Sequence, residues 1–331
     1  MKLIIQIPCY NEAETLPITL SHLPKQIDGI DAIEVLVVDD GSVDDTVRVA
    51  REQGVHHIVR LNHNKGLATG FTAGLDACLR LGADIIVNTD ADNQYAGHDI
   101  SKLVAPILHH QADLVIGDRN TGEIEHFSWT KKRLQWLGSW FIRQLSGSTI
   151  PDATSGFRAL SRDAALRMNV LSKFTYTLET IIQAGKKNMA MTHVPVKINP
   201  QLRESRLFSN NWSYIKKSLA TIVRIYTMYE PLKMFSYIGG AVFGFGLLIG
   251  LRFLYYYLSE GGGGHVQSLI LAAVLLIVGF QIIIMGLIAD IIGSNRQLIE
   301  NVLYRVRKIE LGEQTSALPV SDADEDSDSK G

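Results

Sequence analysis

The chain has 331 residues, of which 46% are hydrophobic and 20% charged, and its formal net charge at pH 7 is −2. This composition is ordinary for a globular protein and argues against a nucleic-acid binder, which would carry a concentrated basic face. The two cysteines, Cys9 and Cys78, have no metal-ligand spacing and are expected to stay reduced.

Strand-length apolar runs alternate with helical patterns through the first 119 residues. Strands are expected at 2–8, 33–40, 56–61, 84–90 and 113–119. Helices are expected at 11–27, 42–54, 66–82 and 100–111. This regular alternation predicts an α/β domain with a mainly parallel, Rossmann-like sheet and helices on both of its faces.

Beyond residue 119 the pattern is less regular. An amphipathic helix is expected at 128–147, and a loop that leads into a helix at 151–168. A further helix at 174–188 and a strand at 191–198 complete the domain. Residues 211–230 carry apolar and basic side chains at helical spacing, which favours an interfacial helix on a membrane surface. An ordinary packed helix is the alternative.

Two long apolar stretches follow, at about 235–258 and 268–290. Each exceeds the roughly 20 residues that an α-helix needs to cross a bilayer. Lysines and arginines lie before and after the pair, but none lies in the short loop between the two stretches. The sequence therefore predicts an integral membrane protein with two spanning helices, whose N-terminal domain and both termini are cytoplasmic.

The chain is thus expected to have four segments. They are an α/β domain (1–210), an interfacial helix (211–232), two transmembrane helices (233–295), and a cytoplasmic helix with a disordered acidic tail (296–331). Small residues in the first apolar stretch would also allow close helix packing within one chain or between copies in a homo-oligomer.

Polar residues follow four of the predicted strands where each one ends. They are Asn11-Glu12, Asp39-Asp40-Gly41-Ser42, Asp90-Ala91-Asp92 and Asp118-Arg119. Ligands of parallel sheets bind at the carboxyl ends of the strands, so these clusters are expected to share one site. Asp90 and Asp92 would offer two carboxylates to Mg²⁺ or Mn²⁺, and Gln94 an amide oxygen. Taken alone, the acidic pair fits an ordinary surface turn equally well.

Six motifs in residues 1–210 together carry a family resemblance. They are "IPCYNEAETL", "VVDDGSVDDT", "NKGLATGFTAGL", "TDADNQY", "IGDR" and "DATSGFRALSR". In this order they resemble the family 2 glycosyltransferases, which have a GT-A fold. More narrowly, they look like the polyprenyl-phosphate glycosyltransferases, a group that includes dolichol-phosphate mannose synthase. The two apolar stretches match the membrane-anchored bacterial members of that group, such as undecaprenyl-phosphate glucosyltransferases.

The resemblance implies roles for individual residues. Contacts to the base and ribose of a donor nucleotide are implied for Pro8, Tyr10, Glu12, Val38 and Asp40. The metal and diphosphate site is implied to consist of Asp90, Ala91, Asp92 and Gln94, with Arg203 and Arg206 gripping the diphosphate. The implied catalytic residues are Asp92, Arg119, which would reach the lipid-linked phosphate or the donor, and Arg133, which would hold the acceptor phosphate.

Two positions depart from the family pattern. The usual glycine before Glu204-Ser205 is missing, and Leu137 stands where a serine is expected. Two further roles stay open. Asp152 is either a site residue or the cap of its loop, and Glu179 is either a catalytic base or a supporting residue.

The resemblance implies an inverting, metal-dependent transfer of one sugar from a UDP- or GDP-linked donor to a polyprenyl (undecaprenyl or dolichyl) phosphate. A phosphate monoester is largely ionised at neutral pH, so its attack requires no strong base. One alternative is a processive polysaccharide synthase, but its Gln-x-x-Arg-Trp motif is absent from the sequence. The other is a non-catalytic nucleotide-sugar-binding membrane scaffold.

Overall fold

The computed structural model describes residues 1–119, 147, 150–170, 176–200, 223, 224, 226–260 and 266–312. The strands are β1 (Lys2–Cys9), β2 (Ala32–Asp39), β3 (His57–Arg60), β4 (Ile85–Asn88), β5 (Leu114–Asp118), β6 (Arg158–Ser161) and β7 (Met191–Pro195). The helices are α1 (Leu16–Ser21), α2 (Thr46–Glu52), α3 (Leu67–Arg80), the 3-10 turn η1 (Gly97–Asp99), α4 (Ile100–Leu108), α6 (Arg162–Arg167), α7 (Thr177–Lys186), α9 (Pro231–Glu260) and α10 (Val266–Glu310).

The seven strands form a mainly parallel sheet, which confirms the predicted fold class. Their order is β3-β2-β1-β4-β6-β5-β7, and among the described strands β6 alone is antiparallel to its neighbours. Strand β1 lies near the centre. Its Ile4 side chain packs in a core with α3, α6 and α7, and its Ile5 in a second core with α1, α2 and α4. Burial on both faces explains the nearly continuous apolar runs of the central strands.

Two local expectations were wrong. Residues 158–161, expected in a loop that leads into a helix, form β6, and α6 begins only at Arg162. Helix α1 covers only six of the residues expected at 11–27. The following Pro24 disfavours a helical conformation of the residue before it, which limits α1 at its C-terminal end.

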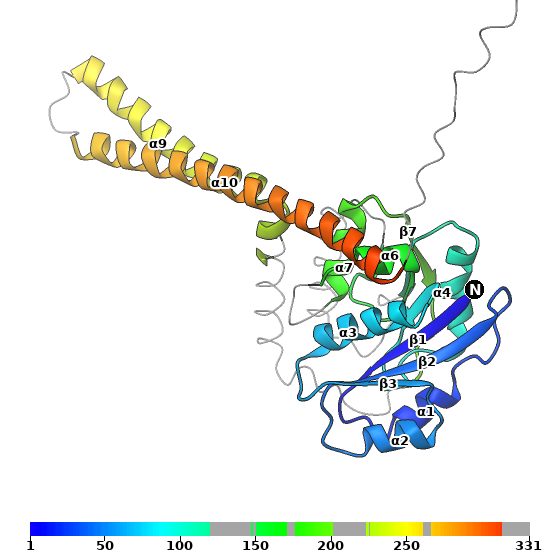
Figure 1. Ribbon diagram of the computed structural model, residues 1–331. Coiled ribbons are helices and arrows are strands. Elements are labelled where there is room, and N and C mark those ends of the chain that lie inside the picture. The colour runs from blue at the N-terminus through cyan, green and yellow to red at the C-terminus, as the bar shows by residue number, and fades with distance from the viewer. Residues whose placement is uncertain are drawn as a thin grey trace, which may run out of the picture.

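Helices α9 and α10 form a hairpin that projects away from the sheet (Figure 1). Both are long and apolar enough to cross a membrane, and they contain the predicted spans. Only 11% and 17% of their most apolar windows are buried, which distinguishes them from the core helices of a soluble domain. The two helices therefore fit a membrane protein.

Helix α10 has 45 residues and continues well beyond the predicted span. At 1.5 Å per residue it is about 68 Å long, roughly twice the thickness of a hydrocarbon core. Its C-terminal part lies against α6, where the Arg307 guanidinium donates hydrogen bonds to the carbonyls of Leu166 and Met168 at 3.1 and 2.8 Å (Figure 1). Most of the expected interfacial helix, 211–232, lies outside the described residues; within it, residues 223, 224 and 226–229 are helical.

The two hairpin helices approach each other closely at glycines. A β-carbon at Gly279 would lie 2.6 Å from the backbone nitrogen of Phe243, whereas a β-carbon at Gly240 would have no neighbour within 4 Å. Gly279→Leu should therefore lower the free energy of unfolding of the hairpin by about 1–3 kcal/mol, because the helices must separate. Thermal unfolding in detergent measures this effect, with Gly240→Leu as the matched control. An equal loss in both variants would contradict it.

Candidate active site

The predicted site residues that the structure describes follow the strands at one edge of the sheet. Tyr10 and Glu12 follow β1, and the Tyr10 ring is 40% exposed. Val38 and Asp40 lie at the end of β2, and the Val38 side chain is fully buried. Only the backbone of Val38 is therefore placed to contact a nucleotide. Pro8, within β1, is partly exposed.

The Asp40 carboxylate binds the start of helix α3. One oxygen accepts a hydrogen bond from the Lys65 backbone N–H at 2.7 Å, and the other accepts from Gly66 at 2.8 Å. Gly66 has a φ of +92°, which suits a glycine at this turn. The N–H groups at a helix start favour negative charge, and here Asp40 supplies it. The structure thus gives Asp40 a role in shaping the loop, beside any contact with a ribose.

The loop after β4 that carries the acidic pair is held from two sides. From α1, the Thr19 hydroxyl donates to the Ala91 carbonyl at 2.8 Å, and beyond its end His22 Nδ1 contacts Asn93 Oδ1 at 2.9 Å. From beyond β7, the Asn199 amide donates to the Asn93 carbonyl at 3.0 Å. Asn93 itself has a φ of +56°, a left-handed conformation that asparagine tolerates. These contacts fix the backbone on which Asp90 and Asp92 lie.

The Asp90 carboxylate lies over the α-carbon of Gly156. A β-carbon at Gly156 would be 3.2 Å from both carboxylate oxygens, so this glycine leaves the space that Asp90 occupies. Burial and the negative charge of Asp92 raise the pKa of the Asp90 carboxyl to about 7. The Asp92 carboxylate accepts a hydrogen bond from the Gln94 backbone N–H at 3.1 Å.

The acidic pair fits a divalent cation that is also bound by a diphosphate. A carboxylate whose ionisation is disfavoured by a neighbouring negative charge, as that of Asp90 is, is stabilised by a cation beside it. Among the described residues, no three His, Cys, Asp or Glu side chains gather into a complete metal cage. A complete cage is not required for Mg²⁺, which typically binds to one or two carboxylates while phosphate oxygens and water occupy its remaining positions.

Arg119 forms a buried ion pair that the sequence did not reveal. Its Nε and Nη2 atoms donate to the two Asp152 oxygens at 2.6 and 3.0 Å, and Nη2 also donates to Thr154 Oγ1 at 2.8 Å. The Asp152 side chain is 1% exposed. Burial alone would raise the pKa of the Asp152 carboxyl, but the hydrogen bonds from Arg119 hold that pKa below its usual value. Asp152 therefore orients Arg119 toward the site.

A network of buried polar side chains lies beneath the acidic loop. The Asn88 amide donates to the Gly156 carbonyl at 2.9 Å and to Tyr176 Oη at 2.8 Å, and it accepts from Gln6 at 2.9 Å. The Arg158 guanidinium lies 5.2 Å from the centre of the Tyr176 ring and is fully buried. These residues were missed at the sequence level, although the polar Gln6 and Asn88 within apolar strands were a signal for them.

The remaining predicted site residues are distributed as follows. Glu179 is 1% exposed in α7, with Oε1 3.9 Å from the Arg296 guanidinium of α10. The Glu179 side chain therefore lies on the face of α7 that points toward α10. Arg133, Arg203 and Arg206 lie outside the described residues.

Comparison with known proteins identifies the family. The model of the family described as Glycosyl transferase family 2 matches residues 4–167. An undecaprenyl-phosphate mannosyltransferase from Micrococcus luteus is 30% identical over 219 residues, which cover 62% of this chain and 88% of that protein. The chain belongs to glycosyltransferase family 2.

Relatives of this glycosyltransferase also match its C-terminal part. An undecaprenyl-phosphate 4-deoxy-4-formamido-L-arabinose transferase from Sodalis glossinidius is 30% identical over 311 residues, 88% of either chain. A glucosyl-3-phosphoglycerate synthase from Mycobacterium tuberculosis, solved with Mn²⁺, UDP-glucose and phosphoglyceric acid, has a TM-score of 0.54 at 20% identity. That match covers 67% of this chain and 79% of the other. It confirms the predicted GT-A fold.

The Arg119–Asp152 pair gives a prediction for the stability of this glycosyltransferase. Asp152→Asn removes one partner of a buried pair and should lower the free energy of unfolding by about 3 kcal/mol at pH 7. The folded-state pKa of Asp152 is lowered, so its contribution is present above the unfolded value near 3.8 and is lost as pH falls through the lower folded value. Denaturant unfolding should therefore show that the difference in free energy of unfolding between the wild type and Asp152→Asn disappears below about pH 4.

Asp76→Asn is the control, because Asp76 pairs with Arg80 on the exposed face of α3. Exposed pairs contribute no more than about 1 kcal/mol. An Asp152→Asn variant no less stable than this control would contradict a supporting role of Asp152.

Proposed function

We propose that this glycosyltransferase transfers one sugar from a nucleotide sugar to the phosphate of a polyprenyl phosphate at the cytoplasmic face of a membrane. The observation that carries the proposal is the apolar hairpin, which α10 joins in one continuous helix to the domain that holds the carboxylates. A soluble acceptor would need no such attachment. The relatives support the proposal, because their names specify undecaprenyl- or dolichyl-phosphate acceptors.

The donor end of the site would be the acidic loop. Asp90, Asp92 and Gln94 would hold Mg²⁺ or Mn²⁺, which neutralises the charge of the departing nucleoside diphosphate when bound. Tyr10, whose ring is exposed after β1, and Glu12 would contact the base and ribose. The tight attachment of the loop to α1 and to Asn199 suits this role, because preorganised charges cost little reorganisation during transfer.

The acceptor end would be formed around Arg119. Its guanidinium, held in a bidentate pair by Asp152, would attract the acceptor phosphate, and Arg133 would add positive charge there. Arg203 and Arg206 would instead grip the diphosphate of the donor; all three of these arginines lie outside the described residues. The acceptor phosphate is substantially ionised at neutral pH, so transfer with inversion needs orientation rather than a strong base. Glu179, buried toward Arg296, is accordingly assigned no catalytic role.

A processive polysaccharide synthase is a weaker candidate. Such enzymes usually need more than two membrane helices to form a polymer channel, whereas the described part of the chain contains two candidate spans. The distribution of lysine and arginine around the hairpin supports cytoplasmic termini. Release of a single-sugar lipid and no polymer would distinguish the two functions.

Asp92→Asn should reduce the rate of sugar transfer at least about 100-fold, because it removes a charge that stabilises the leaving diphosphate. The assay is mass spectrometry of the glycosylated lipid, formed with Mg²⁺ or Mn²⁺ and undecaprenyl phosphate. In the wild type, Mn²⁺ with the nucleoside diphosphate should raise the unfolding temperature; in the variant it should not. A folded Asp92→Asn variant with normal turnover would refute the metal site.

The donor should be found among UDP-glucose, UDP-N-acetylglucosamine and GDP-mannose. Each is incubated with the full chain, the metal and undecaprenyl phosphate, and release of nucleoside diphosphate is measured with and without the lipid. Release that depends on the lipid is the expected result. Binding of a donor without release in any combination would favour the scaffold instead.

A further inference from the structure

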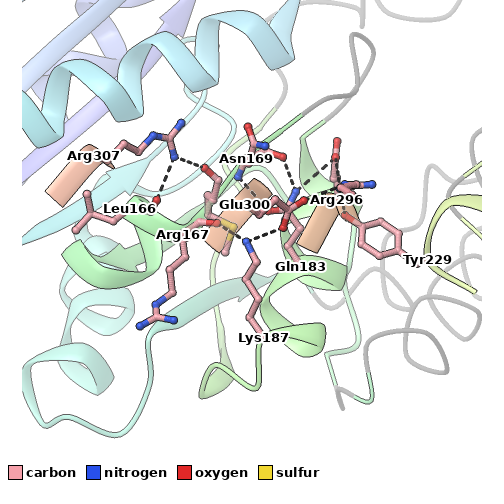
Figure 2. Close-up of polar contacts among 11 residues, drawn as sticks. Leu166, Arg167, Asn169, Gln183, Lys187, Tyr229, Arg296, Glu300 and Arg307 are labelled. Atoms are coloured by element: carbon pink, nitrogen blue, oxygen red, sulfur yellow. Dashed lines mark hydrogen bonds and ion pairs between the residues drawn. The ribbon is translucent and has the colours of Figure 1, made fainter. Parts of the chain in front are cut away.

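The C-terminal part of α10 docks onto α7 through buried charges. Figure 2 shows Glu300 between Arg296, one turn earlier on α10, and Lys187 at the end of α7. Its carboxylate is 2.9 Å from Arg296 Nε and 3.0 Å from Lys187 Nζ, and Glu300 is only 9% exposed. Most of its neighbours on α10 are exposed, so Glu300 marks the face that docks.

Arg296 extends this contact toward the middle of α7. It donates to the Tyr229 hydroxyl at 2.9 Å, and its charge lies over the Tyr229 ring (Figure 2). Its Nη2 atom is 3.9 Å from the buried Glu179 carboxylate. Gln183, between Glu179 and Lys187 on α7, is itself held by Asn169. One face of α7 is therefore fixed by charges that come from the membrane-anchored helix.

The N-terminal turn of α7 contacts the residues beneath the candidate active site. The Arg158 guanidinium donates to the Thr177 carbonyl at 3.2 Å and to the Thr180 hydroxyl, and its other nitrogen donates to the Ser155 carbonyl. Tyr176, the residue before α7, accepts from Asn88 at the end of β4. Helix α7 thus lies between α10 and the strands that carry the site.

Arg158 of β6 also joins α7 to the loop at 152–156, because its guanidinium donates hydrogen bonds to both. This loop contains Asp152, the partner of Arg119, and Gly156, above which the Asp90 carboxylate lies. A shift of α7 would move Arg158, since a fully buried guanidinium has no solvent into which to relax. Glu300 is thus linked to Arg119 and Asp90 by side-chain contacts together with the backbones of α7 and of the 152–156 loop.

We propose that docking of α10 on α7 positions the 152–156 loop for sugar transfer, with Arg296 and Glu300 as positioning residues. The hairpin is then part of the catalytic architecture as well as an anchor. This inference rests on the proposed function, because the loop matters only if Arg119 and Asp90 bind acceptor and donor. The competing explanation is that the hairpin only brings the enzyme to the lipid.

The test uses Glu300→Gln in the full chain and two acceptors. One is undecaprenyl phosphate in vesicles, and the other is a two-isoprene phosphate that dissolves in water. Positioning predicts a loss in kcat of about tenfold with both acceptors, at an unchanged KM for the donor. Glu52→Gln is the matched control, because Arg48 and Glu52 form an Arg–Glu pair of the same spacing on exposed α2, and it should leave kcat unchanged.

Hydrogen exchange gives a second readout that requires no substrate. In Glu300→Gln, amides of α7 and of residues 152–158 should exchange about tenfold faster, while those of β1 keep their wild-type rate. Lys187→Gln should act in the same direction but less strongly, because it removes one of the two ion pairs of Glu300. Adding it to Glu300→Gln should change little, because that pair is already lost.

The outcomes separate the explanations. If Glu300→Gln loses activity with the vesicle acceptor alone, the inference is overturned and the hairpin only anchors the enzyme. If the amides of β1 exchange faster by the same factor as those of α7, the inference is overturned in favour of general destabilisation. If the wild type transfers sugar to neither lipid, the proposed function fails, and the exchange rates still decide whether α10 positions the loop.

Discussion

Parallel strands β1, β2 and β4 end at the same edge of the sheet, and acidic residues follow each of them. Like charges brought so close raise the free energy of the fold unless each carboxylate finds a partner. The Asp40 carboxylate accepts hydrogen bonds from the backbone N–H groups at the start of α3, and Asp152 forms an ion pair with Arg119. Asp39 accepts a hydrogen bond from the Ser42 N–H and forms an ion pair with the Arg60 guanidinium. Burial and the negative charge of Asp92 raise the pKa of the Asp90 carboxyl, so an added cation would stabilise this carboxylate.

Rigid support surrounds that pair on every described side. The acidic loop is tied to α1 and to Asn199, and its floor is Gly156, whose carbonyl and N–H are bound by Asn88 and Tyr95. Buried networks of this kind are costly when only partly satisfied, so they favour one arrangement. The same network reaches α7 and, across it, α10. The acidic loop, the 152–156 loop and α10 are therefore parts of one packed structure.

Much of this could be predicted from the sequence because its signals are local. Apolar periodicity predicted the parallel sheet, and the long apolar runs predicted the helical hairpin. The spacing of Asp90 and Asp92 after a strand predicted a metal site, which stays a prediction. Strand β6 was missed because Arg158 and Ser161 interrupt its short apolar pattern. The Arg119–Asp152 and Lys187–Glu300 pairs join residues far apart in the chain, and no local pattern specifies such partners.

The length of α10 has a mechanical consequence. A helix fixed in the bilayer at one end and docked on a domain at the other acts as a lever whose arm outside the membrane is about 30 Å. Tilting it by 10° would displace its far end by about 5 Å, and transmembrane helices change their tilt with bilayer thickness. The docked end cannot follow such a displacement while Glu300 keeps its ion pair with Lys187 at the end of α7. In a membrane, bilayer thickness would thus exert a force on the α/β domain.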